Sequence, residues 1–158
     1  MDKTPMTAEG AEALRVELKR LTSTERPRIV REISAALAQG DLRENAEFQY
    51  AKEEQGHIEG RISEIAAKLG AAQIINIKEI PKSGRIIFGV TVRLLNLDND
   101  EEVTYKIVGD DEADIKVNKI SVYSPVARSL IGKQQDDVVL IQIPSGQIEY
   151  EILSVEHV

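Results

Sequence analysis

The chain has 158 residues and no cysteine, and its 20 Lys and Arg against 27 Asp and Glu give a net charge of −7. Disulfides, thiolate metal ligands and a cysteine nucleophile are therefore excluded, and the acidic balance argues against a protein that binds nucleic acid unaided. No stretch reaches the roughly 18 apolar residues of a membrane span, so we expect a soluble, cytoplasmic protein without membrane contact.

The first segment, residues 7–38, has the apolar spacing of a helix. Apolar residues recur at steps of four and three, first at Leu14, Leu18 and Leu21 and again at Ile29, Ile33 and Ala36. Pro27 interrupts this segment. Because proline removes a backbone hydrogen bond and clashes with the preceding turn, it predicts a kink or a break there.

A second helix is predicted from Asn45 to Leu69. Its apolar residues follow heptad-like steps of seven, four, three and four, at Ala51, Ile58, Ile62, Ile65 and Leu69. Only residues 39–42 connect the two helices, and short connections produce antiparallel neighbours. Residues 1–75 are therefore predicted to form an antiparallel α-helical coiled-coil hairpin.

After Gly70 the period shifts towards two and β-branched residues become frequent, which predicts strands. The candidate strands cover residues 73–77, 86–95, 103–108, 138–143 and 148–155. Turn residues at 96–100 and 144–146 predict two β-hairpins. A short helix is predicted from Pro125 to Ile131, with Ser124 as its cap and Gly132 as its stop. Residues 76–158 are therefore predicted to form a globular α+β domain.

Asp41 and Glu44 lie three residues apart at the entrance to the second helix, so their carboxylates can face one way. Two carboxylates supply only some of the oxygen ligands that a hard divalent cation needs, so Mg²⁺ would need further ligands from elsewhere. The same spacing is also a capping box, with Asp41 as N-cap and Glu44 reaching back to its backbone N–H. The spacing alone leaves both interpretations open.

Two long motifs stand at separated places in the chain, Gly40-Asp41-Leu42-Arg43-Glu44-Asn45-Ala46-Glu47 and Ser121-Val122-Tyr123-Ser124-Pro125-Val126-Ala127-Arg128-Ser129-Leu130-Ile131-Gly132-Lys133. Shorter ones are Met6-Thr7-x-x-Gly10, Ile86-x-Phe88-Gly89, Asn96-Leu97-Asp98 and Ile107-Val108-Gly109-Asp110-Asp111-Glu112-Ala113-Asp114. In one register across essentially the whole chain, they resemble the signatures of the Gre family of bacterial transcription elongation factors. The resemblance looks closest to the GreA branch of that family.

The resemblance implies that the C-terminal domain is FKBP-like in fold and that the hairpin enters the secondary channel of bacterial RNA polymerase. There, factors of this family stimulate the polymerase to cleave the nascent RNA 3′ end after backtracking, so that arrested complexes resume elongation. Asp41 and Glu44 would help bind the second active-site Mg²⁺, which is not held stably by the free protein, and would position the attacking water. The protein would then be a monomeric cofactor of the polymerase rather than an enzyme, meeting RNA and DNA only through the polymerase.

Weaker expectations concern residues around these motifs. Arg43 and Lys52 are interpreted either as contacts to RNA or the channel wall, or as ordinary solvated charges. Leu37 stands where the family pattern often has a basic residue, which predicts cleavage into short fragments. Phe48 and Tyr50 are interpreted as packing or helix-surface residues, and His57 and His157 as solvated.

Ser121, Ser124 and Pro125 would dock the C-terminal domain on the rim of the polymerase channel, or would only form a strand end and a helix cap. Two other functions compete with transcript cleavage. Prolyl isomerase activity is disfavoured because the chain has only six aromatic residues and no Trp to line an apolar pocket. A ligand that occupies the channel and inhibits without cleavage is disfavoured by the presence of Asp41 and Glu44.

Overall fold

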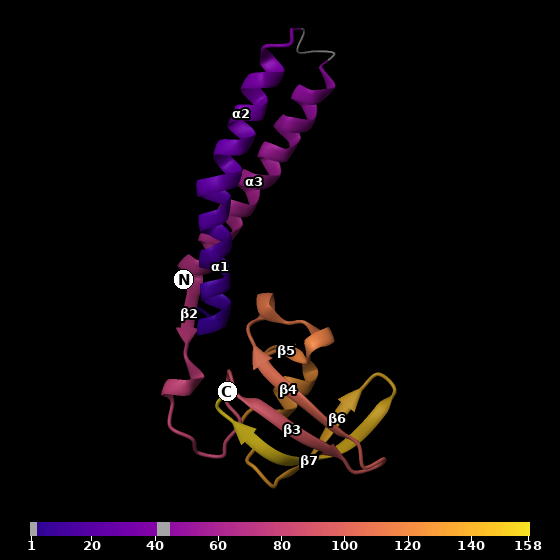
Figure 1. The fold of residues 1–158 in the computed structure, drawn as a ribbon. Coiled ribbons are helices and arrows are strands. Elements are labelled where there is room, and N and C mark those ends of the chain that lie inside the picture. Colours follow the sequence, from indigo (N-terminus) through magenta and orange to yellow (C-terminus); the bar gives the residue numbers. More distant parts are fainter. Residues whose placement is uncertain (1–2, 41–44) are drawn as a thin grey trace. The chain divides into compact units, whose positions relative to one another are not determined.

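The computed structural model describes residues 3–40 and 45–158, and the chain divides into two compact units (Figure 1). The helical unit comprises Ala11–Ala72, and the sheet unit comprises Gln73–Val158 together with residues 3–10. The predicted order, helices first and a sheet second, is confirmed. The sequence analysis did not anticipate that residues 3–10 would group with the sheet.

The helical unit contains α2 (Arg26–Leu37), α3 (Ala46–Ala71) and, from Ala11 onward, α1 (Ala8–Arg20). α2 and α3 lie side by side along their lengths (Figure 1). Their apolar stripes form one core, in which the buried residues are Leu21, Ile29, Ala51, Ile58 and Ile65. The apolar steps read from the sequence of the second helix therefore mark its buried face correctly.

Pro27 does not break the first helical segment. Between α1 and α2 the chain forms a π-helical turn over Leu21–Glu25, in which the Arg26 N–H donates to the Leu21 carbonyl. Pro27 then occupies the first turn of α2, directly after this π-helical turn. Of the predicted kink or break, the break is not found: the helix has an irregular turn just ahead of the proline and continues through it.

Two bidentate ion pairs join the first helical segment to α3. Arg26 Nε and Nη2 donate to Glu59, each at 2.9 Å, and Arg61 Nε and Nη2 donate to Glu17, each at 2.7 Å. The hydrogen bonds from Arg61 hold the pKa of Glu17 below its ordinary value. Since these side chains are about a third to a half exposed, solvent screening keeps the contribution of each pair to stability small.

The sheet unit has a five-stranded sheet with the order β5–β4–β3–β7–β6 (Figure 1). Its strands are β3 (Thr91–Asn96), β4 (Glu102–Val108), β5 (Lys119–Ser121), β6 (Val138–Ile143) and β7 (Gly146–Glu156). Neighbouring strands are antiparallel except β4 and β5. β3 with β4 and β6 with β7 form the two predicted hairpins. A separate two-stranded sheet pairs β1 (Thr4–Thr7) with β2 (Ala72–Ile75).

One face of the five-stranded sheet carries the core of this unit. α4 (Pro125–Leu130) packs against β6 and buries Ala127 and Leu130 there. Ser124 caps α4 as predicted, accepting a hydrogen bond from the Ala127 N–H at 3.2 Å. Gly132 follows the helix with a φ of +89°, a conformation that glycine adopts without strain.

One predicted strand began too early, and two strands, β1 and β5, were not predicted. The candidate strand 86–95 begins only at Thr91, because Gly89 has a φ of +95° and turns the chain, although Ile86 and Val90 are fully buried. β5 was missed, since three residues are too few to show a period of two.

His157 is buried rather than solvated. It is only 6% exposed, and its Nδ1 lies 2.8 Å from the Ile80 carbonyl oxygen and 3.2 Å from that of Ile77. A position next to the last residue of the sequence suggested exposure, but His157 directly follows β7, which brings it into the unit. His57 is exposed, as expected.

Candidate functional site

The connection between α2 and α3 contains the predicted site residues Asp41, Arg43 and Glu44, which lie outside the residues that the structure describes. The structure does describe both ends of this connection. α2 ends at Leu37, and α3 begins at Ala46 with Asn45 as its N-cap. The cap of α3 is therefore Asn45 and not Asp41, so the capping-box interpretation of Asp41 does not account for the start of this helix.

Asn45 makes two hydrogen bonds that the sequence analysis did not foresee. Its Oδ1 accepts from the Phe48 N–H at 3.0 Å, which satisfies one of the free donors in the first turn of α3. Its Nδ2 donates to the Ala36 carbonyl at 2.7 Å. One partly buried side chain thus ties the beginning of α3 to the end of α2, immediately beside the predicted acids. The sequence signal for this cap was an asparagine directly before a stretch with the apolar spacing of a helix.

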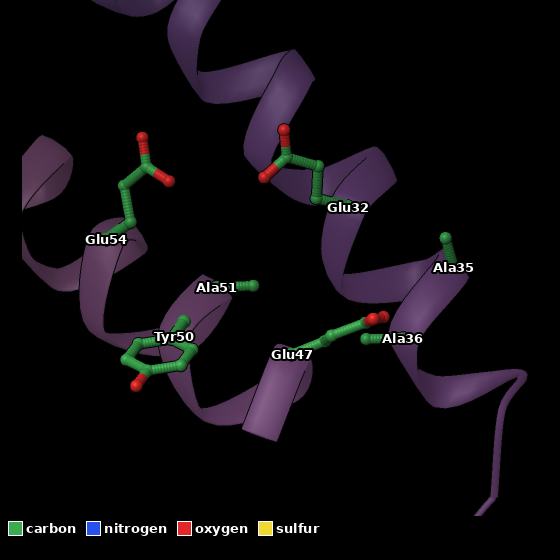
Figure 2. Close-up of a pocket in the computed structure, with 7 residues that line it drawn as sticks. All are labelled: Glu32, Ala35, Ala36, Glu47, Tyr50, Ala51 and Glu54. Atoms are coloured by element: carbon green, nitrogen blue, oxygen red, sulfur yellow. The ribbon is translucent and has the colours of Figure 1, made fainter. Parts of the chain in front are cut away.

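A groove lies between α2 and α3 close to this connection (Figure 2). It has a volume of about 370 Å³. From α2 it is lined by Glu32, Ala35 and Ala36, and from α3 by Glu47, Tyr50, Ala51 and Glu54. Figure 2 shows the Glu47 side chain extending from α3 towards α2, while the Tyr50 ring lies on the α3 side. Three carboxylates therefore surround a floor made of alanine methyl groups.

Arg28 stands beside two of these carboxylates. It donates hydrogen bonds to Glu54, to Glu25 and to Glu32, and the bond to Glu32 Oε1 measures 2.8 Å. The hydrogen bonds, with Glu54 as the largest contributor, raise the pKa of Arg28 above its ordinary value. One guanidinium is thus shared among three carboxylates, and the surroundings of the groove keep an excess of negative charge.

Lys52 and the Phe48–Tyr50 region occupy the same part of α3. Lys52 is exposed and its Nζ donates to Gln55 Oε1 at 3.0 Å. Tyr50 is 73% exposed, and Phe48 is partly buried. Leu37 is 44% exposed at the end of α2.

The predicted docking residues lie in the sheet unit between β5 and α4. Ser121 Oγ donates to Asp110 Oδ1 at 2.9 Å and accepts from the Tyr123 N–H at 3.1 Å. Ser124 and Pro125 form the N-terminus of α4. The same edge carries three exposed apolar side chains that the sequence analysis did not single out, Ile115, Val117 and Tyr123.

Glu112 is another residue that was missed. Its carboxylate accepts hydrogen bonds from the backbone N–H groups of Thr7 and Gly109, each at 3.0 Å, and from the Thr7 hydroxyl. A Cβ atom on Gly10 would overlap this carboxylate. Two of the short sequence motifs, one containing Thr7 and Gly10 and the other containing Gly109 and Glu112, therefore meet in a single contact within the sheet unit.

Within the described ranges, no three His, Asp or Glu side chains are arranged to hold a metal ion. Across the same residues, no helix combines the length and the apolar character needed to cross a membrane.

Comparison with known proteins gives matches along almost the whole chain. A family model described as "Transcription elongation factor, GreA/GreB, C-term" matches residues 81–157, and another described as "Transcription elongation factor, N-terminal" matches residues 4–74. A protein of Yersinia pestis bv. Antiqua (strain Angola) named "Transcription elongation factor GreA" is 58% identical over 158 residues, 100% of each chain.

A protein of the same name from Legionella pneumophila (strain Lens) is 56% identical over 158 residues, which is 100% of this chain and 99% of the other. Among solved structures, GreA factor homolog 1 (Gfh1) of Thermus thermophilus is 24% identical and covers 98% of this chain and 99% of that chain, with a TM-score of 0.44.

Proposed function

This chain belongs to the GreA/GreB family of bacterial transcription elongation factors, and we propose that it stimulates backtracked RNA polymerase to cleave the 3′ end of its nascent RNA. Arrested complexes then resume elongation. In this role the protein acts in the cytoplasm as a cofactor of the polymerase rather than as an enzyme, because it supplies only part of an active site.

One observation supports the location of the catalytic contribution. α2 and α3 form a two-helix rod whose connection contains Asp41 and Glu44, and Asn45 fixes the point at which α3 leaves that connection. We propose that this rod is a coiled-coil hairpin that enters the secondary channel of the polymerase. Groups carried on rigid elements are positioned better than groups on loops, so a rod is suited to deliver two carboxylates into a narrow channel.

Asp41 and Glu44 would hold the second Mg²⁺ of the polymerase. Carboxylate oxygens suit this ion, but two side chains are too few for its coordination, which agrees with a site shared with the polymerase. In two-metal phosphodiester hydrolysis such an ion stabilises the attacking and leaving oxygens. The contribution of this chain is to aim both carboxylates and to orient the water that attacks the RNA.

The sheet unit, for which we propose an FKBP-like fold, would bind the rim of the channel through the segment around Ser121, Ser124 and Pro125. The exposed Ile115, Val117 and Tyr123 flank β5 beside this segment, and a group of exposed apolar side chains is typical of a protein contact. Ser124 also caps α4. A pull-down with Ser124→Ala must therefore be accompanied by a folding measurement, and undiminished binding by a folded variant would reject the docking role.

The direct test uses a stalled, backtracked elongation complex with 3′-labelled RNA, Mg²⁺ and the purified protein. Wild type should release short labelled fragments and allow restart when nucleotides are added. Asp41→Asn and Glu44→Gln should bind the complex but release little or no fragment, whereas Glu53→Gln, on the exposed surface of α3, should cleave normally. Binding without cleavage by wild type would instead identify a ligand that only occupies the channel.

Release of long fragments as readily as short ones would contradict the expectation drawn from Leu37. Arg43 and Lys52 are the remaining candidates for contact with RNA or the channel wall. Arg43→Gln and Lys52→Gln should weaken cleavage only modestly, and an unchanged cleavage rate in both would assign these two residues to the solvated surface.

A further inference from the structure

We propose that the groove between α2 and α3 binds one arginine or lysine side chain from a basic segment of a protein partner (Figure 2). Naming RNA polymerase as that partner rests on the proposed function. The inference about the groove itself rests on its charge, on its apolar floor and on an exposed aromatic ring.

The charge of the groove favours a cation. Glu32, Glu47 and Glu54 line it, and no lysine or arginine among the described residues does so. Arg28 neutralises part of this charge from outside through Glu32 and Glu54. Glu47 takes no part in the hydrogen bonds that join Arg28 to Glu32 and Glu54, and in Figure 2 its side chain extends from α3 towards α2. Glu47 is therefore the carboxylate that an incoming cation would meet.

The floor of the groove suits the aliphatic part of the same side chain. Ala36 and Ala51 are almost fully buried at the bottom of the groove, and the exposed Ala35 adds a methyl group beside them, so no large side chain fills this space. Lys and Arg commonly lay their methylene stems on apolar surface and keep the charged end at a polar rim. The 73% exposed ring of Tyr50 adds an aromatic surface to which a guanidinium is attracted.

Other occupants fit less well. A nucleic acid strand would bring phosphates to three carboxylates, and its binding depends on the opposite charge. A metal ion requires converging ligands, and the described residues hold no group of three acids arranged for that purpose. A side chain from a basic protein segment can place its charged end beside the carboxylates at the rim and its aliphatic part on the alanines of the floor.

The first experiment measures the affinity of fluorescently labelled full-length protein for RNA polymerase by anisotropy. Glu47→Gln removes the charge that faces the groove, and Ala35→Leu fills the groove from an exposed position. Each should raise the Kd by about threefold to tenfold, Glu47→Gln because it removes a charge contact and Ala35→Leu because it fills the space that the incoming side chain needs. Glu53→Gln is the matched control, because it removes the same charge from the same helix outside the groove, and it should bind as wild type does.

Unchanged binding by both groove variants would overturn the proposal. An equal loss of affinity with Glu53→Gln would also overturn it, since the overall negative charge of the protein would then explain the binding. Loss of a self-associated form on Ala35→Leu substitution, detected by sedimentation, would also overturn it in favour of a second copy of this chain.

The second experiment does not depend on the polymerase. An arginine hexapeptide is titrated into isotopically labelled protein, and chemical shifts are followed by NMR. The largest changes should occur at Ala35, Tyr50 and Ala51, and Glu47→Gln should reduce them by at least half. Changes centred elsewhere would overturn the groove. Failure of wild type to bind polymerase, with the groove shifts intact, would count against the proposed function and leave the groove supported.

Discussion

Replacing Asn45 tests whether the connection between α2 and α3 is fixed as the structure indicates. Asn45→Ala removes the cap of α3, worth about 1 kcal/mol, and the hydrogen bond to the Ala36 carbonyl, worth about 0.5–1.5 kcal/mol. The helical unit should therefore lose about 2 kcal/mol. Asn45→Ser keeps a cap acceptor but is too short to reach Ala36, so it should lose about half of that amount.

Urea unfolding followed by helical circular dichroism gives the magnitude. With a denaturant slope of about 1–2 kcal/mol/M, Asn45→Ala should lower the midpoint by about 1–2 M and Asn45→Ser by about half as much. Transcript cleavage should fall in the same order, because both variants loosen the point at which α3 leaves the segment that contains Asp41 and Glu44. Equal urea midpoints for wild type and Asn45→Ala would refute the reasoning. An equal decrease of the midpoint in Asn45→Ala and Asn45→Ser would contradict the smaller loss expected for Asn45→Ser.

Four further predictions concern the folded state. Gly10→Ala should destabilise the protein by about 1–3 kcal/mol in urea unfolding, because its Cβ displaces the carboxylate of Glu112. Gly60→Ala, at a helical glycine with open space around it, should stabilise by about 1 kcal/mol, and destabilisation there would contradict the reasoning. Ile65→Ala, at a fully buried position of α3, should cost about 2–5 kcal/mol, and a thermal midpoint like that of wild type would refute the assigned core. Stability should decline as the pH falls below the unfolded pKa of Glu17 and through its lowered folded pKa, since protonation removes the acceptor of Arg61; Glu17→Gln should flatten this part of the pH profile.

The helices could be predicted from the sequence because their signals are local. The apolar steps of α3 and the capping of α4 by Ser124 depend on residues within a few turns, and the structure confirms both. The burial of His157 could not be predicted in that way. It depends on carbonyl groups nearly 80 residues earlier in the chain, which no local pattern indicates.

The candidate site was predicted only in part. The motif from Gly40 to Glu47 indicated Asp41 and Glu44, which lie outside the described residues and stay a prediction. The sequence also contained Asn45, Glu47 and Tyr50, but not their partners. The bond from Asn45 to Ala36 and the groove lined by Glu47 both depend on how α2 lies against α3. Contacts made across two helices become visible only when the packing is known.

The π-helical turn ahead of Pro27 has a consequence for the length of the helical segment. Leu21 and Ile29 are eight residues apart, and at roughly 100° per residue an uninterrupted α-helix would rotate the second apolar stripe by about 80° away from the first. A π-helical turn spans one residue more than an α-helical turn, so both apolar stripes lie on the face that packs against α3. The helical segment thus contains one additional residue without a change in which of its faces is apolar. A relative with one residue fewer between these positions could form an uninterrupted α-helix with the same apolar face towards α3.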